Sequence, residues 1–167
     1  MNVTYEHKSA MTFIGFSTAI RPEEGYVKCP AFWDTEYSRK YMRLWQTMKP
    51  ETDIEKAILE NRIGMFAICD EKDDSFEYWI AGLYEGGDVP EGLKLYTFPE
   101  SDWAMFSAKG ALPKSLQDLN TQVWSDSPLY SSFLDCNISI HNKHLANHDT
   151  KNHYNYIRLN EINQVVP

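Results

Sequence analysis

The chain has 167 residues, of which 43% are hydrophobic and 24% charged, the size and composition of one folded domain with its own core. A formal net charge of −8 disfavours direct nucleic-acid binding, because an acidic surface repels the phosphate backbone. The three cysteines are far apart and form no Cys-x-x-Cys pair, which excludes the usual zinc and dithiol redox motifs.

The N-terminal segment and the hydropathy of the chain indicate the cellular compartment. The N-terminal segment MNVTYEHK is polar, and no run approaches the roughly 20 apolar residues that a membrane helix needs. We therefore expect one domain over residues 1–167, in the cytoplasm, with no membrane contact. We also expect no DNA-binding domain, because no basic helix-turn-helix segment precedes it.

The first part of the chain reads as strand, loop and helix. Residues 3–17 predict a strand, and residues 21–30, rich in proline and charge, predict a loop. From Phe32, large apolar residues recur at spacings of three and four, which predicts one face of a helix that ends at Pro50. The residues of this face are Trp33, Tyr37, Tyr41, Leu44, Trp45 and Met48.

A second helix and a hairpin follow. Thr52-Asp-Ile-Glu55 has the form of a capping box and predicts a short helix through Asn61. Two apolar runs, 63–69 and 75–84, flank the polar segment 70–74, a pattern typical of a β-hairpin. The polar segment lacks the glycine and the closing glutamate of a calcium loop, so we interpret it as a solvated turn.

The second half repeats this order of elements. Strand-like residues 95–108 are interrupted at Pro99, a helix is predicted at 115–124, and weaker strands are predicted at 136–141 and 153–162. The helix is expected to bury Leu116, Leu119 and Val123. The predicted fold class is therefore α+β: a duplicated β-α-β-β unit forming one antiparallel sheet, with helices on one face and a ligand cleft at the pseudo-two-fold seam.

Four segments of the chain carry a family resemblance. They are FWDTEY (32–37), ILENRIGMFAICDE (58–71), FEYWIAGLYEGGDVPEGL (76–93) and YTFPESDWAMFSAKGALPKSLQDL (96–119). Together and in this order they are similar to the GyrI-like small-molecule-binding family, which includes the AraC effector-binding domains. The resemblance implies the duplicated fold and a stand-alone binding domain for hydrophobic, often cationic, small molecules.

The C-terminal part departs from the family pattern. The family's Glu-Trp-Leu-Pro stretch is replaced by VWSDSPLYSS (123–132), and its closing strand with a tryptophan is replaced by YNYIRLNEINQVVP (154–167). The carboxylate that the family uses against cationic ligands is therefore not fixed by the resemblance. Glu77, Glu85 and Glu161 are the candidates, and Glu161 would be a cation partner only if it were buried near aromatic rings.

Aromatic residues are the other candidates for a ligand site. Side chains alternate along 76–84, so Tyr78 and Trp79 point to opposite faces of their strand. The resemblance favours Tyr78 toward the cleft, and Trp79 stays open. Trp103 would stack on a ligand or hold a cation, although an ordinary core tryptophan fits equally well. The ligand-binding residues expected are Tyr78, Trp103, Glu161, Trp33 and Tyr84.

Two other functions fit the same sequence. A small hydrolase would need an acid, base or water-positioning group in the cleft, for which Tyr78 and Glu161 are the only pair to nominate. No Gly-x-Ser-x-Gly elbow or supported Cys–His pairing is present, so no catalytic residue is assigned. A protein-interaction module of the gyrase-inhibitor type would use the acidic surface against a basic partner. A homodimer is compatible with all three functions.

Neither a metal nor another cofactor is expected. The histidines at 141, 144, 148 and 153 have spacings that match no known metal pattern, and polar residues surround them. We interpret this segment as a surface loop.

Overall fold

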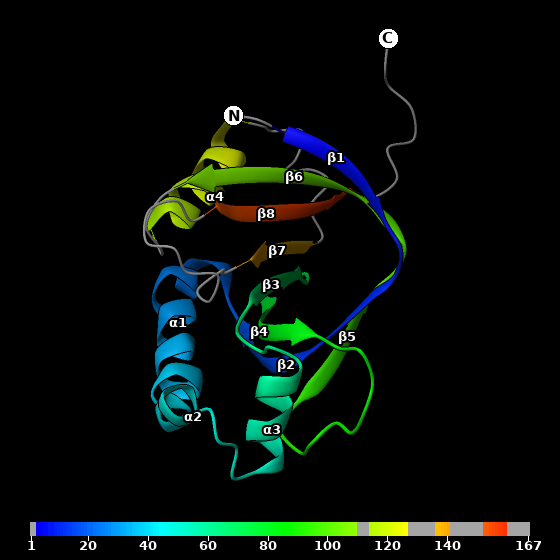
Figure 1. The fold of residues 1–167 in the computed structure, drawn as a ribbon. Coiled ribbons are helices and arrows are strands. Elements are labelled where there is room, and N and C mark those ends of the chain that lie inside the picture. The colour runs from blue at the N-terminus through cyan, green and yellow to red at the C-terminus, as the bar shows by residue number, and fades with distance from the viewer. Residues whose placement is uncertain (1–2, 110–113, 127–135, 141–151, 160–167) are drawn as a thin grey trace.

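The computed structural model describes residues 3–109, 114–126, 136–140 and 152–159 (Figure 1). Eight strands form one antiparallel sheet in the order β1-β6-β8-β7-β3-β4-β2-β5. The strands are β1 (Val3–Lys8), β2 (Met11–Ile20), β3 (Phe66–Glu71), β4 (Phe76–Leu83), β5 (Lys94–Phe98), β6 (Ser101–Lys109), β7 (Cys136–Ile140) and β8 (Asn152–Leu159). The helices are η1 (Pro22–Glu24), α1 (Gly25–Phe32), η2 (Trp33–Ser38), α2 (Met42–Thr47), α3 (Asp53–Glu60) and α4 (Lys114–Asp126).

The sheet has two similar halves that meet where β3 pairs with β7. In chain order, β2, the helices α1 to α3, β3 and β4 form one β-α-β-β unit, and β6, α4, β7 and β8 form the other. The duplicated α+β fold is thereby confirmed. In the described part of the chain, no helix has the length and apolar character needed to cross a membrane.

The two halves are also joined by a long antiparallel ladder. β1 pairs with β6 and β2 pairs with β5 in one continuous register, from Val3 opposite Phe106 to Gly15 opposite Lys94. Figure 1 shows both partners as long, bent strands on the right-hand side of the molecule. The predicted break at Pro99 is confirmed, whereas the strand predicted at 3–17 is two strands that continue to Ile20.

The predicted loop at 21–30 is wrong, and the helix predicted from Phe32 is interrupted between η2 and α2. Its apolar face is confirmed, because Tyr37, Tyr41 and Leu44 are buried in one cluster on which Trp33 and Trp45 pack. The chain is helical from Pro22, and Pro30 lies inside α1. Proline has no N–H to donate to the preceding turn, and the next turn is the wide π-type helix η2. Met48 has a left-handed backbone (φ 54°) after the end of α2 and is 58% exposed, so it does not join the buried face.

Several other sequence predictions are confirmed. Thr52 Oγ1 accepts the N–H of Glu55, and a Glu55 carboxylate oxygen accepts the N–H of Thr52, both at 3.2 Å, which completes the capping box of α3. β3 and β4 form the expected hairpin. In α4, Leu119 and Val123 are buried as predicted. The side chain of Leu116 lies outside the described residues.

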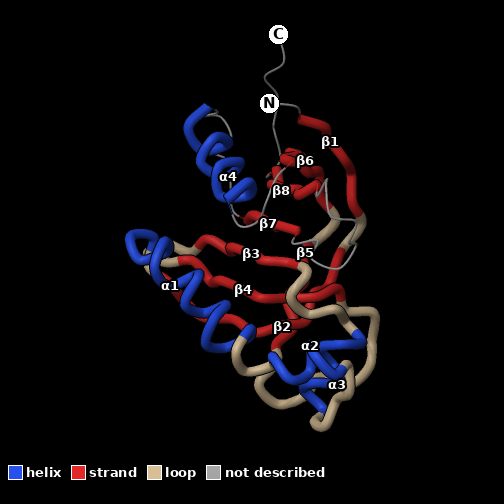
Figure 2. Tube along the Cα trace, turned by 60° about the vertical axis from the view of Figure 1, so that its left-hand side comes forward, coloured by secondary structure: helices blue, strands red, loops and turns tan. Residues whose placement is uncertain are grey.

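The sheet carries an apolar layer on each face. Ile14 and Ile80 pack under the helices with Tyr37, Leu44 and Ile58. On the opposite face, the buried residues are Phe13, Ile68, Trp79, Ala81, Phe98 and Trp103. Figure 2 shows α1 and α4 on the same side of the sheet, so one face is covered by helices from both halves.

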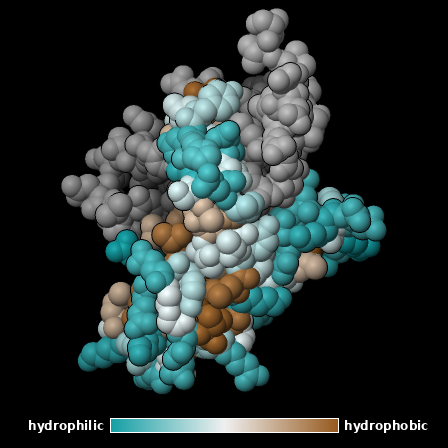
Figure 3. Space-filling model, turned by 90° about the vertical axis from the view of Figure 1, so that its right-hand side faces the viewer, coloured by the Kyte–Doolittle hydropathy of each residue, from teal (hydrophilic) through white to brown (hydrophobic). Residues whose placement is uncertain are grey.

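The chain needs a glycine where β4 passes under the end of α3. A Cβ at Gly82 would lie 1.9 Å from the carbonyl oxygen of Asn61, so only glycine permits this approach. Seen from the side of the long strands, the surface is mostly hydrophilic, and its largest apolar area lies in the lower half (Figure 3).

Candidate ligand-binding site

Tyr78 and Trp33 meet on the helix-covered face of the sheet. Trp33 Nε1–H donates a hydrogen bond of 2.8 Å to Tyr78 Oη. Tyr78 comes from the central strand β4 and is only 8% exposed, while Trp33 is half-buried at the first position of η2. The structure therefore brings together two of the residues that the sequence nominated.

Other aromatic rings surround this pair. Phe32 and Phe76 each lie edge-on to Tyr78, with ring centroids 6.3 Å apart. Tyr37 lies edge-on to Trp33 at 5.4 Å. Such edge-to-face contacts hold the rings in fixed orientations. The result is an aromatic cluster, defined here as Trp33, Tyr78, Phe32, Phe76 and Tyr37.

The Tyr78 phenol is protonated at neutral pH. Burial raises its pKa well above the usual value, because an apolar surrounding disfavours the charged form. Its oxygen accepts a hydrogen bond from the Trp33 N–H, and among the described residues no acceptor is found for the phenol's own O–H. Tyr78 is therefore a hydrogen-bond donor available to a ligand that reaches it.

Two thiols lie beside the cluster. Cys29 of α1 and Cys69 of β3 are among the residues packed against Tyr78. Burial raises the pKa of Cys29 to about 11 and also raises the pKa of Cys69. Both side chains are therefore neutral and apolar near pH 7, and neither is poised as a nucleophile or as a metal ligand.

The cluster lies close to the seam between the two halves. Tyr78 is opposite Cys69 in the β3–β4 ladder, and Cys69 is opposite Asn137 of β7 in the next ladder. Only β3 therefore separates Tyr78 from the seam. The side of the sheet that carries Tyr78 is also the side on which α1 and α4 lie (Figure 2).

Trp103 and Trp79 lie on the other face of the sheet. Both are at most 2% exposed and belong to the layer that contains Phe98, whose ring lies 5.3 Å from that of Trp103. Neither indole N–H has a hydrogen-bond partner among the described residues. A ligand at Tyr78 would be separated from Trp103 by the sheet. The two residues therefore cannot line one site on the helix-covered face, and a ligand-binding role for Trp103 stays a prediction.

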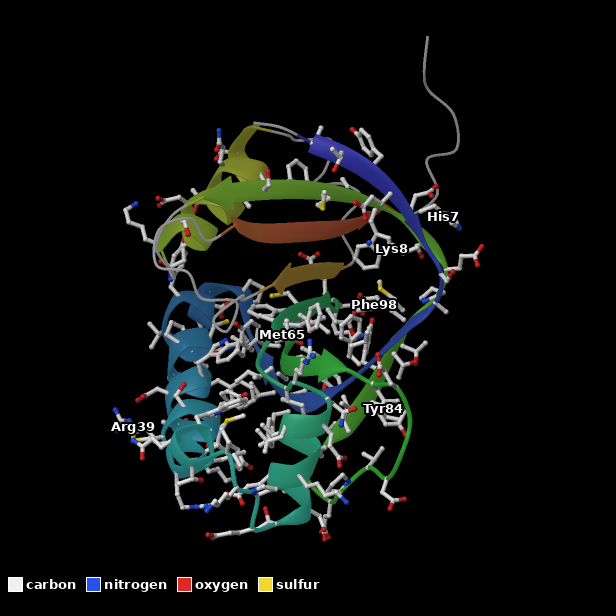
Figure 4. All side chains as sticks on the ribbon, in the orientation of Figure 1. His7, Lys8, Arg39, Met65, Tyr84 and Phe98 are labelled. Atoms are coloured by element: carbon white, nitrogen blue, oxygen red, sulfur yellow. The ribbon has the colours of Figure 1, made fainter. Side chains whose placement is uncertain are left out.

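The remaining predicted residues are dispersed. Tyr84 follows β4, and its hydroxyl donates to the Gly87 carbonyl at 2.5 Å; Figure 4 shows it on the right-hand side of the molecule, opposite α1. Glu77 shares the face of Trp79 and accepts a 2.7 Å hydrogen bond from Ser17. Glu85 is exposed in the loop after β4. Glu161 lies outside the described residues.

The histidine-rich segment is largely outside the described residues too. Only the one at 153 falls in a strand, β8, and its side chain is not described. Within the described ranges, no three potential metal-ligating side chains come together.

A groove lies at the outer edge of the sheet; Phe32 of the aromatic cluster lines it, whereas Tyr78 and Trp33 do not. It has a volume of about 610 Å³ and runs between β2 and the helices α1 and η2. Three lysines and one glutamate line it, namely Lys28, Lys40, Lys94 and Glu36. This lining does not favour a cationic ligand. No sequence pattern indicated the groove, because it exists only where β2 extends beyond the end of its partner β5.

The sequence reasoning also missed the neighbours of Tyr78. Phe32, Cys69 and Phe76 complete its surroundings, and none was nominated. Alternation along the two hairpin strands was the available signal, since it places Cys69 and Phe76 on the same face as Tyr78 once the register is known.

Comparison with known families decides the relationship. The family model of Cass2, an integron-associated effector-binding protein, matches residues 5–158. The chain belongs to this effector-binding family. The resemblance to GyrI-like effector-binding domains is thereby confirmed. Among curated protein sequences, none matches the chain.

Solved structures of similar fold agree with this assignment. SAV2435 bound to tetraphenylphosphonium aligns with a TM-score of 0.73 at 16% identity, covering 96% of this chain and 94% of that one. A putative transcription regulation protein of Staphylococcus aureus MU50 gives 0.70 at 15% identity, covering 96% and 99%. The Vibrio cholerae integron cassette protein VCH_CASS2 gives 0.63 at 12% identity, covering 95% of each chain. At these identities the likeness shows a common fold.

Proposed function

We propose that this effector-binding protein binds hydrophobic, cationic small molecules on the helix-covered face of its sheet, beside Trp33 and Tyr78. The observation that carries the proposal is the hydrogen-bonded Trp33–Tyr78 pair, buried among aromatic rings one strand from the seam. Such binding fits the sensing or sequestration of lipophilic compounds.

The chemistry of the aromatic cluster supports a cation. The faces of aromatic rings are electron-rich, and a cation over one of them gains about 0.5–2 kcal/mol depending on how far it is desolvated. The net charge of −8 raises the local concentration of cations around the molecule. The related fold of SAV2435 holds tetraphenylphosphonium, a lipophilic cation, which supports the same class of ligand here.

Trp33 is the side chain that has to move when a ligand enters. Tyr78 is fixed on a central strand with neighbours on both sides. Trp33 is half-buried and begins the wide turn η2, where the regular helix is already interrupted. A ligand would therefore displace Trp33 from Tyr78 and take its place in the aromatic cluster, with the Tyr78 hydroxyl beside it.

Binding is tested with methyltriphenylphosphonium and its neutral analogue of similar shape, triphenylphosphine oxide. We expect the cation to quench tryptophan fluorescence and raise the melting temperature, and the neutral compound to do so more weakly. Trp33→Phe should remove most of the quenching, whereas Trp103→Phe, on the opposite face of the sheet, should leave it in place. Equal binding of both compounds would contradict the preference for cations, and no binding of either would contradict the proposal.

A further inference from the structure

β2 is longer than the strand beside it. β5 pairs with Met11–Gly15 only, while β4 pairs with β2 as far as Ile20. The segment Phe16–Ile20 therefore has a strand on one side and, within the described part of the chain, none on the other.

The direction of the backbone groups along this open edge follows from one hydrogen bond. Tyr84 N–H donates to the Thr12 carbonyl at 2.9 Å, so the backbone groups of Thr12 face β4. In an antiparallel strand, alternate residues direct their N–H and C=O groups to alternate neighbours. The register with β4 is unbroken, so Ser17 and Ala19 direct their backbone groups away from β4, to the open edge.

The open edge borders the groove of about 610 Å³ described above. The apolar part of the groove consists of Phe16, Ile20, Ala31, Phe32 and Ile54. An unpaired strand edge next to an apolar groove is a template for the strand of another chain.

Charges on the helical side of the groove indicate which chain. At spacings of four and eight along α1, η2 and their flanks, the charged residues are Glu24, Lys28, Glu36 and Lys40, while Asp34 and Arg39 form an ion pair with each other. Lys28 pairs with Glu24 at 2.8 Å, and Lys40 lies 4.0 Å from Glu36. In a dimer with a two-fold axis through the middle of this series, Glu24 of one copy would face Lys40 of the other, and Lys28 would face Glu36. A second copy is thus complementary in charge, whereas a uniformly charged peptide would meet like charges.

We propose that this edge binds a second copy of the same chain. The two β2 strands pair antiparallel about Thr18, so that Ser17 lies opposite the partner's Ala19. In this register, Ser17 and the Ala19 opposite it both direct their backbone groups toward the other strand. Each such pair can therefore form two N–H···O hydrogen bonds. It also brings α1 against the partner's α1 and joins the two sheets into one. The interface adjoins the candidate ligand site, because Thr18 lies opposite Tyr78 in the β2–β4 ladder and Phe32 lines the groove as well as the aromatic cluster. Self-association is measured without ligand, so its failure would leave the proposed ligand site untouched.

The first test is the mass of the protein in solution, by sedimentation or light scattering over a range of concentrations. We expect dimers of the 19.4 kDa chain that dissociate on dilution. Amide hydrogen exchange should slow at Ser17 and Ala19 as the concentration rises. A monomer at every concentration would overturn the proposal.

Ala19→Pro tests the strand pairing. The substitution removes an N–H that faces the open edge, so the ladder with β4 is kept. We expect the dimer to weaken by about tenfold or more, with Ala19→Ser as the matched control that keeps the N–H. Unchanged dimer affinity in a folded Ala19→Pro protein would overturn the proposed pairing.

Charge reversal tests the helix contact even if the proline variant fails to fold. Lys28→Glu and Glu36→Lys should each weaken the dimer, because each creates like-charge pairs across the two-fold axis. An equal mixture of the two variants should form a heterodimer, because the new carboxylate at position 28 of one copy then faces the new ammonium group at position 36 of the other. A mixture that associates no better than either variant alone would overturn this arrangement.

Discussion

At the scale of single residues, the hydrogen bond between Trp33 and Tyr78 defines the candidate site. Alternation along β4 established that Tyr78 and Trp79 face opposite ways, but it could not say which face the helices cover. That information comes from packing: Tyr78 contacts Phe32 and Trp33, while Trp79 joins the layer opposite. The burial of Trp103 on that second layer was equally hidden, because a core tryptophan and a ligand-stacking one have the same sequence pattern.

The bond can be tested through stability. Tyr78→Phe removes the acceptor and leaves the Trp33 N–H without its partner, which should cost about 1–3 kcal/mol of unfolding free energy. Urea denaturation measures the change. Tyr26→Phe, at a tyrosine that is 87% exposed, is the control and should change stability by no more than about 0.5 kcal/mol. Equal stabilities of the two variants would show that the Trp33–Tyr78 bond contributes nothing.

At the scale of elements, local signals succeeded where the interaction is local. The capping box of α3 involves only Thr52 to Glu55, and it was readable directly. The helix α1 was missed because Pro30 and the charged residues before it favour a loop, whereas contacts of Cys29 and Phe32 with the sheet hold this segment helical. Tertiary packing therefore overrode the local preference.

Thr52→Ala tests the contribution of that cap. The substitution removes the side-chain acceptor for the Glu55 N–H, and we expect a loss of about 1 kcal/mol in unfolding free energy. Thr121→Ala, within α4, removes an exposed threonine whose hydroxyl donates to the Gln117 carbonyl. Alanine has the higher helix propensity, so this control should be neutral or slightly stabilising. A loss at Thr121 as large as that at Thr52 would argue against the cap.

At the scale of the whole molecule, the order of elements was enough to predict the duplicated fold. Two β-α-β-β units in one antiparallel sheet were expected and are present. The exchange of edge strands was not foreseen, because pairing β1 with β6 and β5 with β2 depends on contacts between distant segments. The open edge of β2 was missed for the same reason: it follows from where β5 begins, at Lys94.

The fold also separates two interactions that the sequence could not distinguish. Trp33 and Tyr78 do not line the groove, although Phe32 belongs to both the aromatic cluster and the groove, and the open edge of β2 lies on the outer side of the strand that pairs with β4. We therefore expect substitution of Trp33, which does not line the groove, to act on ligand binding, and Ala19→Pro, at the open edge, to act on self-association.

The most direct test of ligand binding follows the indole N–H signals of the five tryptophans by NMR during titration with methyltriphenylphosphonium. Each signal is assigned by its Trp→Phe variant. We predict the largest shift for Trp33, whose N–H bonds to Tyr78, and little change for Trp79 and Trp103 on the opposite face. Large shifts at Trp79 and Trp103 with Trp33 unchanged would place the ligand on the other side of the sheet and contradict the proposed site.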